Sequence, residues 1–296
     1  MGSGEQAMGE AVLTESVVAQ EQQLPGGLYY RHWKAVGVTR AVILLVHGLG
    51  EHSGRYQGLA DILCAGGFTI VAPDHIGHGH SAGRRGHLLN FEEYTAPLQM
   101  LRVKIGQDYP GLPCFLIGHS MGGLISARYL LDSQQQFVGA VLSGPALAVA
   151  EPPSALLLMI NALFSKLWPS LALMQLDASL VSRDPAVVRA YIEDPLVLHG
   201  RASARLVSEL FRAMEEVRKR RAEIQLPILI MHGAEDALTA VSGSEDLHIN
   251  ITSSDRTLRI YPGLYHEIFN EPERLDVIAE LVSWLEERIP DNVQSR

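Results

Sequence analysis

The sequence predicts an α/β fold, in which a mostly parallel sheet carries helices on both faces and a helical cap is inserted. Two observations support this. Short apolar runs rich in β-branched residues alternate with longer helical patterns, and the alternation stops between Leu147 and about Leu206. Alternating strands and helices are typical of parallel sheets, because each helix returns the chain to the edge where the next strand begins. With 47% hydrophobic residues in a chain of 296, the sequence can also bury a sizeable core.

The strand predictions depend on apolar runs that end at glycine, proline or a polar residue. Ala41–Val46 is the clearest, because a continuous aliphatic run is typical of a strand buried on both faces. The expected strands are Leu28–Ala35, Ala41–Val46, Phe68–Ala72, Cys114–Ile117, Phe137–Leu142, Pro227–Met231 and Thr257–Tyr261. The expected core helices are Gln57–Ala65, Phe91–Asp108, the segment that begins after Gly123, Ser203–Glu223 and Pro272–Arg288.

These elements divide the chain into three parts. Residues 1–23 are polar and turn-prone, so we expect a flexible leader there. Residues 24–146 and 207–296 form the α/β core, and residues 147–206 form the cap inserted into it.

The cap contains a long apolar stretch, Ser154 to Leu176, in which Lys166 is the only charged residue. Its length and composition approach those of a transmembrane helix. Pro169 interrupts it, however, and a span here would separate the sheet from its remaining strands. A buried cap helix is a second alternative. We favour a cap with an exposed apolar face that contacts a membrane surface.

The strongest chemical signal is the stretch Gly118-His119-Ser120-Met121-Gly122, in which a serine has a glycine two residues to each side. A buried strand precedes this stretch and a helical pattern follows it. A turn this abrupt forces the serine into strained backbone geometry and exposes its hydroxyl at the carboxyl edge of the sheet. The alternative is a structural turn with an incidental serine. We expect Ser120 to be a nucleophile.

A serine hydroxyl needs a general base, and the late loops supply one together with an acid. Asp236 and His266 each follow a late strand, which gives the chain order serine, aspartate, histidine. Glu235 is a rival acid, but its longer side chain suits the turn less well. His232 and His248 are rival histidines. Since position 120 is a serine, chemistry that requires an acidic nucleophile is excluded.

The glycine-rich loop His47–Tyr56 follows the strand Ala41–Val46 and can direct backbone amides toward the serine. In enzymes with this serine turn, one amide of such a loop and the amide after the nucleophile stabilise the oxyanion. These rules assign the amides of Leu49 and Met121.

Composition excludes several other functions. The formal net charge of −9 disfavours nucleic acid as a partner.

The two cysteines, Cys64 and Cys114, lie in apolar runs and are expected to be buried free thiols in a reducing compartment. Four histidines cluster at positions 75, 78, 80 and 87, but they alternate with glycines and lack the paired spacing of a metal site. We therefore expect a structural turn there, no metal and no cofactor.

Several loops together resemble one family, the monoacylglycerol lipases of the α/β-hydrolase superfamily. The resemblance extends from about Leu24 to Leu285. The matching stretches are His47-Gly48-x-Gly50-Glu51-His52-Ser53-Gly54-Arg55-Tyr56, Asp74-His75-x-Gly77-His78-Gly79-x-Ser81, Tyr109-Pro110-Gly111-Leu112-Pro113, Gly118 to Gly123, Asp194-Pro195-Leu196 and Tyr261-x-Gly263-x-Tyr265-His266.

The resemblance implies an α/β-hydrolase fold with an eight-stranded sheet, and hydrolysis of monoacylglycerols through an acyl-serine intermediate without a cofactor. It further implies a membrane-contacting cap, a cytoplasmic but peripherally membrane-associated protein, and a homodimer among the expected assemblies. The polar end of the pocket maps onto Glu51, Arg55, His119 and Tyr191.

Two positions depart from the family pattern. Phe269 stands where the mammalian enzymes have a histidine, and Thr239 replaces a cysteine near the acid. Recognition of glycerol and sensitivity to thiol reagents therefore stay open. A lysophospholipase or general carboxylesterase is an alternative within the same chemistry. A non-catalytic lipid-binding receptor of this fold is an alternative from another class.

Overall fold

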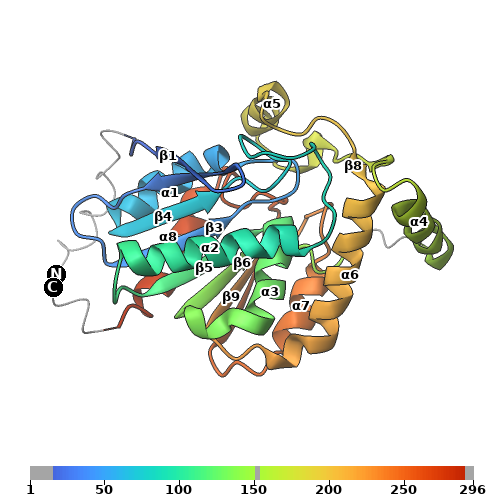
Figure 1. Ribbon diagram of the computed structural model, residues 1–296. Helices are drawn as coiled ribbons and strands as arrows, with labels where there is room; N and C mark the ends of the chain where they lie inside the picture. Colours follow the sequence, from blue (N-terminus) through green and yellow to red (C-terminus); the bar gives the residue numbers. More distant parts are fainter. Residues whose placement is uncertain (1–15, 151–153, 291–296) are drawn as a thin grey trace.

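The structure is a computed structural model that describes residues 16–150 and 154–290. A twisted sheet of eight strands, in the order β1-β2-β4-β3-β5-β6-β9-β10, forms its centre (Figure 1). The six strands β4, β3, β5, β6, β9 and β10 run parallel to one another, whereas β2 is antiparallel to β4 and β1 is antiparallel to β2 at that edge of the sheet. The predicted fold class, a mostly parallel sheet with helices on both faces, is confirmed.

The sheet strands lie close to the predicted ranges. They are β1 (Gln20–Leu24), β2 (Leu28–Trp33), β3 (Ala41–Val46), β4 (Phe68–Pro73), β5 (Cys114–His119), β6 (Gly139–Ser143), β9 (Ile228–Gly233) and β10 (Arg256–Tyr261). The core helices are α1 (Gln57–Ala65), α2 (Glu92–Asp108), α3 (Met121–Ser133), α6 (Ala204–Arg220), α7 (Val241–Asn250) and α8 (Arg274–Glu286).

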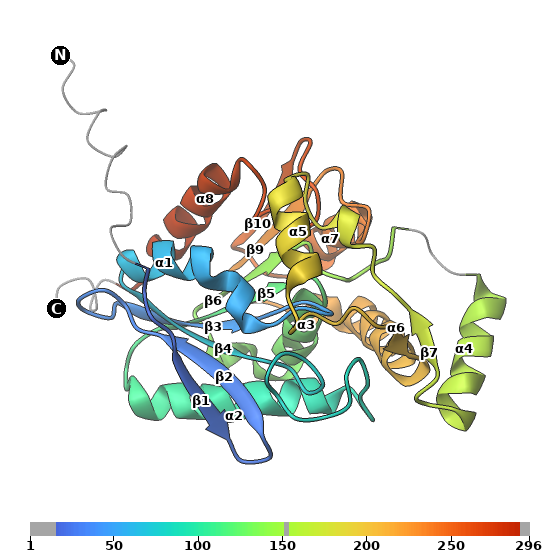
Figure 2. The same cartoon turned by 90° about the horizontal axis from the view of Figure 1, so that it is seen from above.

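Alternation along the strands divides the core into two layers, because successive side chains point to opposite faces of a sheet. Val42 and Leu44 of β3 pack with α2, α3 and α6 on one face. Ile43 and Leu45 pack with α1 and α8 on the other face. Seen from above, α1 and α8 lie on the side opposite α2 (Figure 2). Burial on both faces explains why β3 reads as a continuous apolar run.

The core begins earlier in the chain than the sequence predicted. Strand β1 occupies Gln20–Leu24, of which the first four residues had been assigned to the flexible leader. Before it, the Val17 amide donates a 2.9 Å hydrogen bond to the Asp61 carboxylate of α1. The earlier part of that leader, residues 1–15, lies outside the described residues.

The segment between β6 and α6 contains α4 (Ala155–Leu167), β7 (Ala172–Met174), α5 (Pro185–Glu193) and β8 (Ala202–Ser203). The short antiparallel pair β7–β8 was not expected in a helical cap. Helix α4 ends before Pro169, because proline disfavours helical geometry at the residue before it. Within residues 16–150 and 154–290, no helix is both long and apolar enough to cross a membrane.

Candidate active site

Ser120 sits at the sharp turn between β5 and α3. Its φ of 55° makes it the only non-glycine residue with positive φ in the described chain. The glycines around it are required by space: a Cβ at Gly118 would lie 2.4 Å from the Gly122 carbonyl oxygen, and one at Gly122 would lie 2.1 Å from that of Val46. The backbone is thus held in a strained conformation that presents the serine hydroxyl at the sheet edge.

His266 and Asp236 meet beside this serine. The Nδ1–H of His266 donates a 2.6 Å hydrogen bond to Oδ2 of Asp236, and both side chains are buried. His266 also lines the cavity that contains Ser120. The hydrogen bond at Nδ1 leaves Nε2 as the ring nitrogen able to accept a proton. The structure therefore brings the three predicted catalytic residues to one edge of the sheet.

The Asp236 carboxylate is held by further donors. The backbone amides of Leu238 and Thr239 donate to Oδ1 at 2.8 and 2.9 Å. The Thr239 hydroxyl donates to Oδ2 at 2.8 Å. Burial by itself would raise the Asp236 pKa, but the hydrogen bonds from His232 and His266 outweigh it and hold the pKa well below its usual range. Asp236 is therefore a fixed anion.

The pKa of His266 shifts in the opposite direction. Burial by itself would lower it, but the hydrogen bond and charge of Asp236, assisted by the charges of Glu267 and Glu51, raise it above 6.5. The protonated imidazole is thus stabilised, as a general base requires after it has accepted a proton.

None of the rival residues lines the cavity that contains Ser120. Glu235 is exposed to solvent. His232 packs behind the acid, where its Nδ1 lies 2.7 Å from the Ser244 hydroxyl. His248 belongs to α7. Of these residues, only His232 touches the Asp236–His266 pair, at 3.2 Å from Oδ2 of Asp236.

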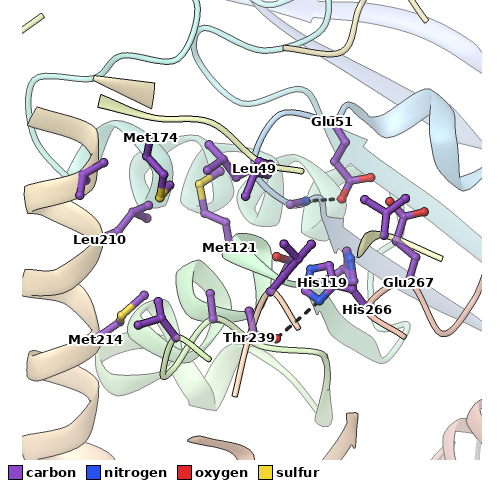
Figure 3. A pocket seen from close by; sticks show the side chains of 18 of the residues that line it. Leu49, Glu51, His119, Met121, Met174, Leu210, Met214, Thr239, His266 and Glu267 are labelled. Carbon is purple, nitrogen blue, oxygen red and sulfur yellow. Dashed lines mark hydrogen bonds between the residues drawn. The ribbon is translucent and has the colours of Figure 1, made fainter. Parts of the chain in front are cut away.

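Ser120 lines a largely apolar cavity, whose space of about 760 Å³ includes solvent at its open mouth. Figure 3 shows this cavity from close by. Its aliphatic and thioether lining comes from both the core and the segment between β6 and α6. The apolar lining residues are Leu49, Met121, Ala146, Val149, Met174, Leu176, Val181, Val207, Leu210, Phe211, Met214 and Leu238. Such a lining suits a hydrocarbon chain.

Leu49 and Met121 contribute to this cavity at the serine. The amide of neither residue has a hydrogen-bond acceptor within the described chain. The Met121 amide is the first of α3, where the helix dipole favours negative charge. Both amides are therefore free to bind a developing oxyanion.

Polar groups gather at the opposite side of the serine. The Arg55 guanidinium bonds both oxygens of Glu267 at 2.5 and 2.9 Å and one oxygen of Glu51 at 3.2 Å. It also stacks on the Tyr191 ring at 4.6 Å. His119 lies beside His266, with ring centroids 4.7 Å apart. The predicted polar residues are thus gathered near the serine, and we call Glu51, Arg55 and Glu267 the carboxylate–arginine cluster.

Glu267 was not predicted from the sequence. It follows His266 directly, but its partner Arg55 lies 212 residues away, so only the fold brings them together. Burial by itself would raise the pKa of Glu267, but the charge and hydrogen bonds of Arg55 outweigh burial and lower this pKa. For Glu51 the effect of burial is the larger one, and its pKa is raised. Two buried carboxylates thus share one guanidinium, and the direction of the two pKa shifts makes Glu267 the more readily ionised partner of Arg55. Burial also lowers the His119 pKa to about 3, so that ring is neutral.

Phe269 and Thr239, the two positions that depart from the family pattern, both lie close to the catalytic site. Phe269 lines a small cavity of about 280 Å³ next to the carboxylate–arginine cluster. Thr239 bonds the acid, as described above. Burial raises the pKa of both Cys64 and Cys114 to about 12, so neither thiol is reactive.

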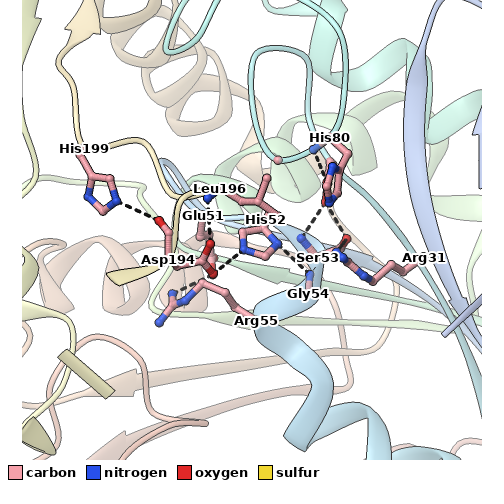
Figure 4. A network of polar contacts seen from close by, with 12 residues as sticks. Arg31, Glu51, His52, Ser53, Gly54, Arg55, His80, Asp194, Leu196 and His199 are labelled. Atoms are coloured by element: carbon pink, nitrogen blue, oxygen red, sulfur yellow. Dashed lines mark hydrogen bonds and ion pairs between the residues drawn. The ribbon is translucent and has the colours of Figure 1, made fainter. Parts of the chain in front are cut away.

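The loop that carries Leu49 is fixed from two sides. Nε2 of His47 accepts a 2.9 Å hydrogen bond from the His75 amide. On the other side, His52 bonds the Asp194 carboxylate at 2.9 Å, as Figure 4 shows. The Leu198 amide donates a 2.7 Å hydrogen bond to the Gly50 carbonyl. We call the contacts of Asp194 and Leu198 with this loop the cap clamp.

The histidines of the loop after β4 help to hold the loop that carries Leu49. His75 and His78 are buried, and the His75 ring contacts the His47 carbonyl at 3.0 Å. In the chain that the structure describes, no group of three or more histidine, cysteine or acidic residues is arranged to hold a metal ion.

A parallel-sheet core, a strained serine and an Asp–His pair at the carboxyl edge define an α/β hydrolase of the serine type. Comparison with known proteins agrees. A family model described as serine aminopeptidase, S33, matches residues 37–273. The monoacylglycerol lipase of Mycolicibacterium smegmatis is 39% identical over 258 residues, which cover 87% of this chain and 92% of that relative. The monoglyceride lipase of Rattus norvegicus is 35% identical over 88% of both chains.

Solved structures give the same result. The crystal structure of the Paleococcus ferrophilus monoacylglycerol lipase has a TM-score of 0.81 and 35% identity, and the match covers 88% of this chain and 99% of that one. The chain belongs to the monoacylglycerol lipase family of the α/β-hydrolase superfamily. The family resemblance predicted from the loops is thereby confirmed.

Proposed function

We propose that this protein hydrolyses monoacylglycerols to a free fatty acid and glycerol. The observation that carries the proposal is that Ser120 lines one cavity together with many apolar side chains and with Glu51 and Glu267 of the carboxylate–arginine cluster. An ester with a hydrocarbon acyl chain and a small hydroxylated alcohol matches both kinds of side chain. The identities of the relatives named above support the same substrate.

In the proposed reaction, Oγ of Ser120 attacks the ester carbonyl carbon while Nε2 of His266 accepts the hydroxyl proton. Asp236 holds the imidazole orientation and stabilises the imidazolium. The amides of Leu49 and Met121 stabilise the tetrahedral oxyanion, at about 3 kcal/mol for each donor. His266 then protonates the glycerol oxygen as its bond to the acyl carbon breaks.

Water completes the cycle. It attacks the acyl-serine carbonyl while His266 accepts one of its protons, and that proton returns to Oγ of Ser120 as the fatty acid departs. Every proton is carried by His266, so the residues of the chain suffice for the reaction.

The carboxylate–arginine cluster favours a neutral alcohol. Glu51 and Glu267 accept hydrogen bonds, as glycerol hydroxyls require, and Tyr191 closes this side over Arg55. The Arg55 guanidinium is already bound by both carboxylates, so a phosphate group placed in the same position would find no free cation and would lie beside the ionised Glu267. The charge therefore favours a monoacylglycerol over a lysophospholipid.

A substrate panel tests this proposal. Oleoylglycerol should be hydrolysed faster than lysophosphatidylcholine or a short nitrophenyl ester, and Ser120→Ala should abolish turnover. Equal rates of the wild type and Ser120→Ala would refute the role of the serine. A strong preference for the short ester would favour the general carboxylesterase. Absence of labelling by a fluorophosphonate in the folded protein would favour the lipid-binding receptor.

We further propose that the segment of residues 147–206 acts as a cap that docks on a membrane surface. Helix α4 supports this, because its polarity is inverted relative to a helix of a water-soluble protein. Asn161 and Ser165 are buried, whereas Leu156, Leu163 and Leu167 are more than half exposed. The Ser165 carbonyl accepts hydrogen bonds from Arg205 of α6, so the polar side faces the core.

The exposed apolar residues continue beyond α4. They are Leu156, Leu157, Met159, Ile160, Leu163, Leu167, Trp168 and Leu171. Many exposed apolar side chains within so short a segment, with Lys166 as the one charged residue among them, mark an interaction site. A bilayer surface is the proposed partner, because a monoacylglycerol resides in membranes and because β7 and the residues after it follow this surface in the chain, with Met174 and Leu176 lining the cavity that contains Ser120.

A further inference from the structure

A second cavity, whose space of about 570 Å³ includes solvent at its open side, is lined by residues of α6, α7 and the segment after β6. Met214 of α6 lines both cavities. The segment after β6 also separates them, since Ala146 and Val149 line the first cavity whereas Leu147 and Ala148 line the second. The two cavities are therefore adjacent, and Met214 lies at their shared boundary.

The second cavity is apolar where it meets Met214. Leu147, Ala148, Val217 and Leu247 line this part. Two arginines stand at the rim, but each is neutralised: Arg218 bonds Glu215 at 2.7 and 2.8 Å. Arg221 pairs with Asp246 at 3.1 Å.

The positions of the apolar and the paired charged side chains determine which class of ligand the second cavity can bind. An anion would compete with carboxylates that already bind both guanidinium groups. The apolar part continues the lining of the cavity over Ser120. A hydrocarbon chain that enters from that cavity would meet apolar side chains throughout this part.

We propose that the second cavity receives the terminal methylenes of long acyl chains, and that Met214 is the residue that controls their entry. The inference rests on the proposed hydrolysis of monoacylglycerols. Methionine suits this role, because its unbranched and flexible side chain fills gaps and changes conformation easily. Met214 is half-buried, so its side chain has room to move.

Chain-length preference tests the proposal. The specificity constants of lauroyl-, oleoyl- and nervonoylglycerol are measured in detergent micelles for wild type and Met214→Ala. Burial of one further methylene is worth about a fourfold gain in binding. We expect the ratio of nervonoyl to lauroyl hydrolysis to rise about tenfold in Met214→Ala, which corresponds to one or two further buried methylenes.

Three variants serve as controls. Leu210→Ala removes a side chain that lines only the first cavity, so it should not raise the ratio. Met214→Leu conserves volume but replaces an unbranched side chain by a branched one, so it should not raise the ratio. Met214→Ala/Ser242→Trp fills the second cavity from its exposed rim and should return the ratio to that of wild type.

The possible outcomes are distinct. An unchanged ratio in Met214→Ala, or an equal rise in Leu210→Ala, would refute the proposed gate while the hydrolysis of oleoylglycerol by the wild type still stands. No hydrolysis of any monoacylglycerol by the wild type would refute the proposed function itself. If Met214→Ala does not fold, as judged by fluorophosphonate labelling, Met214→Val provides the same comparison.

Discussion

The inverted helix α4 allows a quantitative prediction about membrane binding. Leu156 and Leu163 are 67% and 54% exposed and lie seven residues apart, on one side of the helix. Complete burial of a leucine side chain is worth about 1.5–3 kcal/mol, so the exposed part of each is worth about 1 kcal/mol or more. Leu156→Ser/Leu163→Ser should therefore lose about 2 kcal/mol of membrane affinity, or about thirtyfold in the partition coefficient.

Sedimentation with phosphatidylcholine vesicles measures this partition coefficient, and a soluble nitrophenyl ester measures the catalytic site independently. The matched control is Ile249→Ser/Leu275→Ser, which removes two equally exposed apolar side chains, at 71% and 62%, from α7 and α8. The control should bind vesicles as the wild type does, and both double variants should hydrolyse the soluble ester normally.

Two results would refute the reasoning. If both double variants lost vesicle binding equally, the apolar surface of α4 would have no special role. If binding fell steeply with added salt, charge would be the main contribution, which contradicts an apolar contact.

Three further predictions concern the catalytic site and the histidines. Asp236→Asn should lower kcat about 10⁴-fold with little change in the melting temperature, because the amide selects the wrong imidazole tautomer; a tenfold loss would contradict the assigned acid. Catalysis needs neutral His266, whose pKa is raised, so kcat/KM should fall as pH drops through a value above 6.5. Glu267→Gln should move this acidic limb to lower pH, and an unchanged limb would exclude the effect of that charge. His75 and His78 have pKa values lowered by burial to about 3 and 4, so the unfolded chain takes up their protons first. The free energy of unfolding should thus fall between pH 6.5 and about 4, by up to about 1.4 kcal/mol per pH unit for each histidine, in chemical denaturation at graded pH.

His266 opposes the predicted fall in the free energy of unfolding at acid pH. Because the His266 pKa is raised, this residue contributes stability below pH 6.5 and loses it as pH rises through its folded pKa. A double variant His75→Asn/His78→Asn should flatten the acid dependence. An unchanged slope in that variant would show that other groups cause it.

Much of the core could be predicted because its signals are local. The continuous apolar run of β3 and the glycines around Ser120 identify their structures without knowledge of distant residues. Strand β1 was missed for the opposite reason: its sequence, Gln-Glu-Gln-Gln-Leu, is polar, and it pairs with β2 at the edge of the sheet. An edge strand of this kind shows no apolar periodicity.

The features of the site that could not be predicted from the sequence depend on contacts between residues far apart in the chain. Glu267 acquires its role only from Arg55, which no spacing along the chain reveals. Similarly, the sequence shows that α4 is apolar, but only its packing on α6 shows that Asn161 and Ser165 face inward.

The cap clamp has a consequence for how this protein could change during evolution. Asp194 and Leu198 bond the loop that carries the Leu49 amide, so under the proposed mechanism this part of the segment 147–206 is coupled to the rate of the chemical step. Helix α4 makes no such contact and packs instead on α6. If α4 docks on a membrane as we propose, natural variation could exchange this helix and so direct the protein to a different lipid surface, while the loop that carries Leu49 keeps its contacts with Asp194 and Leu198.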